Sequence, residues 1–113
     1  MGMDPKTILV ASIRPANGQP DEFLEANFPE YENEGEICLV PGSGSYEDCY
    51  SINVYDVVNT EGFEIHEPVT YGWGDFITLS ELMEKLSKFE KKVAHFCTVY
   101  DCTYSINIGA TFD

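Results

Sequence analysis

The sequence predicts an α+β fold, in which a mainly antiparallel sheet of four or five strands carries one long amphipathic helix on one face. Several short segments alternate apolar and polar residues with the period of a strand, whereas one segment near the C-terminus repeats apolar residues every three or four positions. The 113 residues, of which 43% are apolar, suit a single domain over 1–113 with one core. We leave residues 1–5 out of the functional reasoning, as a tag remnant or disordered.

The N-terminal half begins with a strand and continues into an acidic region. Residues 7–13 place apolar side chains at 8 and 10 on one face and at 9, 11 and 13 on the other, which is typical of a central strand. A short helix is expected over 20–26, with Asp21 and Glu22 in its first turn. The rest of 16–36 reads as an acidic loop.

Further strands are expected over 37–40, 50–58, 63–69 and 102–112. Segments 50–58 and 63–69 flank a turn sequence and predict an antiparallel hairpin, with Phe63 and Ile65 inward, Glu64 and His66 outward, and Pro68 indicating an edge. One face of the sheet is expected to be more polar, and it is either solvated or pairs with a second copy in a homodimer. Its residues are Ser51, Asn53, Thr103, Ser105 and Asn107.

The long helix is predicted over 79–99. Thr78 and Glu81 form a capping box at its start, and Ile77 can pack on Leu82 as a hydrophobic staple. Four lysines within 85–92 fall mainly on its solvent side, where they can pair with glutamates one turn earlier. Its apolar stripe comprises Leu79, Leu82, Met83, Leu86, Phe89, Val93 and Phe96.

The negative charge is the main functional signal. The net charge is −14, and between Pro15 and Glu84 there are sixteen acids without one lysine or arginine. Such a surface attracts a basic protein and repels nucleic acid and anionic lipid. We therefore expect neither direct nucleic-acid binding nor membrane association.

The cysteine and histidine pattern predicts no metal site and no cofactor. Cys38, Cys49, Cys97 and Cys102 form no C-x-x-C pair, and the chain has two histidines. No stretch approaches the length of a membrane span. A cytoplasmic protein with free thiols is expected, unless two of the cysteines meet in the fold.

In size and charge the chain is similar to nucleic-acid mimics such as phage anti-restriction and anti-CRISPR proteins, and to acidic immunity proteins. The leading hypothesis is a non-enzymatic inhibitor of a basic nuclease or other nucleic-acid-binding protein. Tyr71 and Trp73 lie in an unusual glycine-flanked segment and are candidate interface anchors. The full set of expected partner-binding residues is Glu22, Glu25, Glu30, Glu32, Glu34, Glu36, Glu47, Asp48, Glu61, Glu64, Glu67, Tyr71 and Trp73.

Two alternatives remain open. In the first, the chain is an accessory or structural protein of a phage, mobile element or bacterium, and its acidity serves solubility. In the second, it is an enzyme or ligand-binding protein that uses His66, Tyr55 or Tyr104 in a pocket between helix and sheet. Clustered acids would favour the inhibitor, scattered acids the accessory protein, and a pocket with a histidine and a carboxylate the enzyme.

Overall fold

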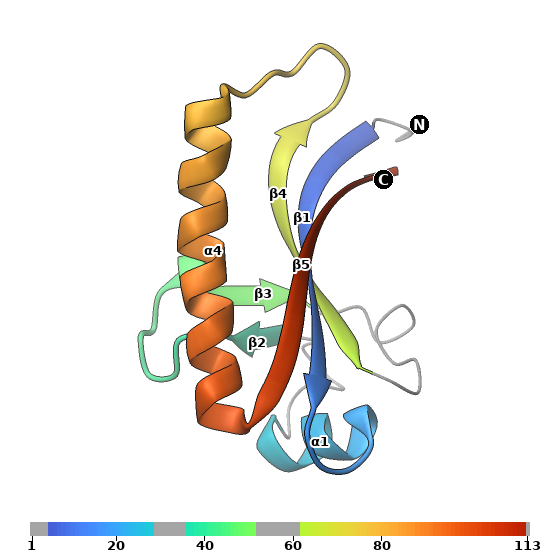
Figure 1. Cartoon of the computed structure of the whole chain (residues 1–113), viewed down its shortest axis with the longest axis vertical. Helices are drawn as coiled ribbons and strands as arrows, with labels where there is room; N and C mark the ends of the chain where they lie inside the picture. Colours follow the sequence, from blue (N-terminus) through green and yellow to red (C-terminus); the bar gives the residue numbers. More distant parts are fainter. Residues whose placement is uncertain (1–4, 29–35, 52–61, 113) are drawn as a thin grey trace.

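The computed structural model describes residues 5–28, 36–51 and 62–112. Its main feature is a three-stranded antiparallel sheet in the order β4-β1-β5, with the long helix α4 alongside it (Figure 1). The α+β class with a helix packed on an antiparallel sheet is therefore confirmed. The elements are β1 (Pro5–Pro15), β4 (Phe63–Tyr71), α4 (Leu79–Tyr100) and β5 (Cys102–Phe112).

The prediction of four or five strands in one sheet is too high. Two further strands, β2 (Glu36–Cys38) and β3 (Cys49–Ser51), pair with each other in a separate two-stranded sheet. Each has only three residues, and β3 lies against β4 without joining the main sheet. The predicted hairpin of 50–58 with 63–69 rests largely on residues 52–61, which lie outside the described residues.

β1 is the central strand, as its two-sided apolar pattern predicts. It pairs along its length with β5, and it also pairs with β4. Leu9, Ala11 and Ile13 are buried in the core that α4 covers. Ile8, whose side chain points to the opposite face, is buried as well. Burial on both faces explains why apolar residues occupy consecutive positions in this strand.

Local hydrogen bonds define where α4 begins and ends. The Thr78 hydroxyl accepts a hydrogen bond from the Glu81 backbone N–H at 3.1 Å, which confirms the predicted N-cap. At the other end, Asp101 adopts the left-handed conformation with φ 56°, and its N–H donates to the Cys97 carbonyl. β5 begins at the next residue. One residue therefore connects the long helix to the last strand.

The core lies between α4 and the sheet and is closed at one end by aromatic rings. Phe96 is completely buried, and its ring centroid lies 4.7–6.4 Å from those of Phe23, Phe28, Phe63 and Tyr100. Helix α1 (Pro20–Asn27), predicted over 20–26, carries Phe23 and lies near the end of α4 (Figure 1). The core also contains Leu9, Ala11, Ile13, Leu24, Ile37, Leu39, Tyr50, Ile65, Val69, Phe89, Val93 and Cys97.

Two of the four cysteines do meet in the fold. Cys38 and Cys49 are direct partners in the β2–β3 ladder and form a disulfide, with Cα atoms 4.0 Å apart. Cys97 and Cys102 are free thiols. Burial raises the pKa of Cys97 to about 12 and that of Cys102 to about 11. Both free thiols are therefore protonated at neutral pH and are poor nucleophiles.

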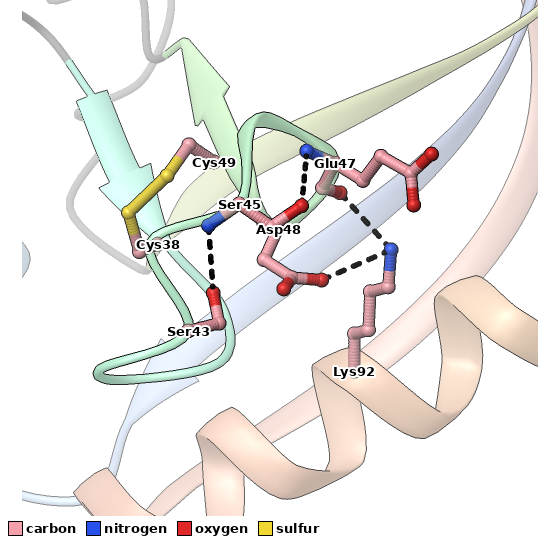
Figure 2. Close-up of polar contacts among 7 residues, drawn as sticks. All are labelled: Cys38, Ser43, Ser45, Glu47, Asp48, Cys49 and Lys92. Carbon is pink, nitrogen blue, oxygen red and sulfur yellow. Dashed lines mark hydrogen bonds and ion pairs between the residues drawn. A yellow bond between two sulfur atoms is a disulfide. The ribbon is translucent and has the colours of Figure 1, made fainter.

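Lys92 joins the β2–β3 unit to α4 (Figure 2). Its Nζ donates to the Glu47 backbone carbonyl at 3.0 Å and lies 3.2 Å from the Asp48 carboxylate. A short 3₁₀ helix, Tyr46–Asp48, holds both acceptors, and the Ser45 hydroxyl caps it by accepting from the Glu47 N–H. The Asp48 side chain is thus directed at a lysine of the same chain.

We expect Asp48 to make the fold sensitive to acid. A hydrogen bond with Ser43 and the ion pair with Lys92 lower the pKa of Asp48 despite the opposing effect of burial. Because the folded pKa lies below the ordinary value of 3.8, the stabilisation is present above that value and is lost as the pH falls through the folded pKa. Urea unfolding at neutral pH and below about pH 4 should therefore show a smaller acid-induced loss for Asp48→Asn than for the wild type. Equal losses would contradict this role.

Candidate protein-binding surface

The apolar stripe of α4 is buried along only part of the helix. Phe89, Val93 and Phe96 pack into the core, whereas Leu79 and Met83 near the start of the helix are 78% and 68% exposed. The 22 residues of α4 extend over about 33 Å. In Figure 1, β1 and β5 curve away from α4 at the end where the helix begins. The described fold therefore leaves Leu79 and Met83 uncovered, whereas Leu82 between them packs partly against the core.

The end of β4 and its connection to α4 expose three aromatic side chains. Trp73 is 80% and Phe76 is 90% exposed, and Tyr71 is exposed at the end of the strand. Together with Leu79 and Met83 they occupy residues 71–83, and we call these five side chains the apolar surface. Scattered apolar residues are normal on a protein exterior, but five large exposed ones within residues 71–83 make this segment a candidate interaction site.

The backbone that presents Trp73 is held in place by hydrogen bonds. The Gly72 N–H donates to the Pro5 carbonyl at 2.8 Å, which ties the connection to the start of β1. The Tyr71 N–H donates to the Asp75 carboxylate at 2.7 Å, which closes the turn. Gly72 and Gly74 have φ values of 104° and 79°, a region that glycine adopts without strain. These contacts hold the backbone next to Trp73 in place.

The acids predicted to bind a partner do not lie together on one element of the fold. Glu22 and Glu25 are exposed on α1, at the opposite end of the molecule from the start of α4 (Figure 1). Glu47 is exposed and Asp48 is partly buried beside Lys92. These four acids therefore do not adjoin the apolar surface.

The remaining predicted acids are divided between β4 and parts of the chain without a described side chain. Glu64 and Glu67 are partly buried on β4, and the Glu64 carboxylate lies 3.3 Å from the His66 ring. Glu36 begins β2, but its side chain is outside the described part. The acids within residues 71–83 are Asp75 and Glu81, both exposed. Outside the described residues lie Glu30, Glu32, Glu34 and Glu61.

An open hollow of about 450 Å³ lies at the opposite end of the sheet from the apolar surface. Arg14, Glu64 and Tyr104 help to line it, together with the hydroxyl residues Ser12, Thr103 and Ser105. His66 adjoins the hollow through Glu64 but is exposed. Tyr55, also considered for catalysis, lies outside the described residues. The histidine and the carboxylate therefore meet at the surface and not inside an enclosed pocket.

Sequence reasoning identified Tyr71 and Trp73 but missed the other three members of the apolar surface. It assigned Leu79 and Met83 to the buried stripe, because helical periodicity is the same whether or not a partner covers it. Phe76 was not singled out at all. Length gives no signal, because the 22 residues of α4 span about 33 Å and the eleven residues of β1 or β5 about 36 Å. The exposure arises from the curvature of these strands away from the start of α4, which periodicity does not show (Figure 1).

Comparisons with known proteins suggest no function for this chain. No protein-family model, no curated protein and no solved structure matches this chain. Within residues 5–28, 36–51 and 62–112, no group of three or more histidine, cysteine or acidic side chains could hold a metal ion. In the same part of the chain, none of the helices combines the length and apolar character needed to cross a bilayer.

Proposed function

We propose that this chain is a non-enzymatic binding protein that docks on a partner protein through the apolar surface. The exposure of Trp73 on a hydrogen-bonded turn, followed within six residues by exposed Phe76 and Leu79, carries the proposal. Large aromatic anchors commonly provide most of the free energy at protein interfaces, while the residues around them exclude water. The neighbouring acids Asp75 and Glu81 would form a charged rim.

The preferred partner is a basic protein of the nucleic-acid-handling class, which the chain would inhibit by occupying its cationic surface. The net charge of −14 supports this choice, because it accelerates the approach of a basic partner and disfavours acidic ones. In this proposal, charge selects the class of partner and the apolar surface holds it. Such binding needs no catalytic residue and no cofactor.

An accessory protein that binds a subunit of its own assembly is the second candidate. The distribution of the described acids favours it, since they are spread over α1, β2, the 3₁₀ helix, β4, α4 and the connection between β4 and α4. In that case the apolar surface would still be the contact, but the charge would serve solubility. The salt dependence of binding separates the two candidates.

The test begins with capture of a partner from a lysate of the producing cells, followed by titration calorimetry with the purified partner. We expect Trp73→Ala and Phe76→Ala each to weaken the Kd about 30-fold, which corresponds to an anchor contribution of about 2 kcal/mol. Tyr46→Ala is the matched control, because Tyr46 is an exposed aromatic residue on the 3₁₀ helix. Binding that is unchanged in both surface variants would refute the proposed contact.

Two further measurements decide the class of partner. For a basic partner, the wild-type Kd should weaken at least tenfold between about 50 and about 500 mM salt, because counterions screen the attraction. The captured protein should also lose its nucleic-acid binding when this chain is added. A Kd that is insensitive to salt, with nucleic-acid binding unimpaired, would favour the accessory protein.

A further inference from the structure

β5 forms one edge of the described three-stranded sheet. Its eleven residues, Cys102–Phe112, pair with β1 along their whole length. Among the strands that the structure describes, β5 has a neighbour on that side only. Side chains along it are exposed on both faces, including Ile108 on the face toward α4 and Asn107 on the other. An unpaired edge of this length readily accepts another strand.

The outward hydrogen-bonding groups of β5 can be assigned from the ladder. The Ala16 N–H donates to the Asp101 carbonyl at 3.0 Å, in register with the β1–β5 pairing. Backbone groups alternate in direction along a strand, so the odd-numbered residues from 103 to 111 also face β1. The N–H and C=O groups of the even-numbered residues therefore point away from the sheet. Within the strand these include Tyr104, Ile106, Ile108 and Ala110.

This edge lacks the features that usually prevent strand addition. Natural sheets protect their edges with charged residues, proline, bulges or very short strands. Cys102–Phe112 contains no charged residue and no proline, and its pairing with β1 is regular. The opposite edge strand, β4, has two glutamates, Pro68 and an irregularity in its pairing with β1 near Thr7 and Ile8. The protection is thus present at one edge of the sheet and absent at the other.

From this contrast we infer that β5 pairs antiparallel with β5 of a second copy, which forms a continuous six-stranded sheet across a twofold axis. The net charge of −14 on each chain opposes contact between two copies, so such a contact requires a strip without charge on both partners. β5 supplies such a strip, bounded by Asp101 and Asp113. Antiparallel pairing of two identical strands is compatible with the twofold symmetry of most dimers.

Full overlap of the two strands fixes one register. The axis passes beside Asn107, so that Ile106 of one copy faces Ile108 of the other, and Tyr104 faces Ala110. All of the outward N–H and C=O groups assigned above then find partners. Ile108, which is 57% exposed in the single chain, becomes covered on the α4 side. The two Asn107 side chains meet on the opposite face, in a non-hydrogen-bonded pair with Cα atoms about 4.5 Å apart.

Oxidative cross-linking tests this register directly. In Asn107→Cys, the two introduced thiols face each other at a separation that permits a disulfide. Mild oxidation should give a covalent dimer on non-reducing gels, and Ser105→Cys should not, because position 105 faces Gly109 of the second copy. Equal cross-linking of the two variants, or none of Asn107→Cys, would overturn the assigned pairing.

The mass in solution provides the second test. Sedimentation equilibrium of the wild type at about 100 µM should give twice the 12.7 kDa of one chain. Ile108→Glu should weaken dimerisation at least tenfold, and so should Ala110→Pro, which removes one outward N–H but leaves the β1 ladder intact. Val99→Glu is the matched control, since it adds the same charge on α4 at a residue that is 51% exposed.

The alternative occupants give different results. A monomeric wild type would overturn the dimer and leave the edge to an extended segment of another protein. A dimer that Leu79→Glu dissociates and Ile108→Glu does not would place the contact on the apolar surface instead. Because the two surfaces are changed by different variants, failure of the dimer can be distinguished from failure of the proposed function.

Discussion

Replacing Phe96 by alanine is expected to lower the free energy of unfolding by about 3–5 kcal/mol. Phe96 is completely buried, and its ring contacts rings from α1, β4 and α4 as well as Phe28. The variant would lose this apolar burial and leave a cavity among rigid rings that cannot collapse fully. Urea unfolding followed by circular dichroism measures the change.

Phe76→Ala is the matched control for this prediction. It makes the same chemical change at a side chain that is 90% exposed, so the free energy of unfolding should change by no more than about 0.5 kcal/mol. If the two variants lost similar stability, the assignment of Phe96 to the core and of Phe76 to the surface would be wrong. The same control also shows that any loss of binding in Phe76→Ala is not a loss of folding.

Loss of the Cys38–Cys49 disulfide should have the second largest effect, about 3 kcal/mol. The bond closes a short loop, and removing it lets the unfolded chain sample more conformations. A reducing agent should therefore lower the urea midpoint of the wild type, and Cys38→Ser with Cys49→Ser should reproduce the lower value without reductant. Reductant should have no further effect on this double variant. A wild-type midpoint that does not respond to reduction would show that the disulfide contributes little stability.

The elements that the sequence predicted best are those with complete local signals. α4 combines a capping residue, Thr78, with a long apolar stripe, and β1 and β5 follow strand periodicity over most of their lengths. β2 and β3 carry only three residues each, too few for periodicity to show which strand they pair with. Their pairing also determines the disulfide, so the bond between Cys38 and Cys49 could not be deduced from spacing alone.

The sequence predicted only Tyr71 and Trp73 of the apolar surface, for a different reason. Trp73 was noticed because glycines flank it, a feature of local sequence. Leu79 and Met83 satisfy the same periodicity as Phe89 and Val93, and only the three-dimensional packing separates the exposed pair from the buried pair. Sequence predicts which face of a helix is apolar, but what covers each turn depends on strands that are distant along the chain.

The central position of β1 has a consequence for how the chain folds. β1 precedes both of its neighbours in the sequence, and Ile8 pairs with Gly109 roughly 100 residues further along. During synthesis, β1, which has apolar residues on both faces, therefore emerges before β4 and β5. Its pairing in the sheet is complete only when β5 has been made. Contacts so distant in sequence slow folding. The apolar side chains of β1 are consequently exposed to solvent until β5 has been made. Until then, the acidic charge of the newly made chain helps to prevent its aggregation.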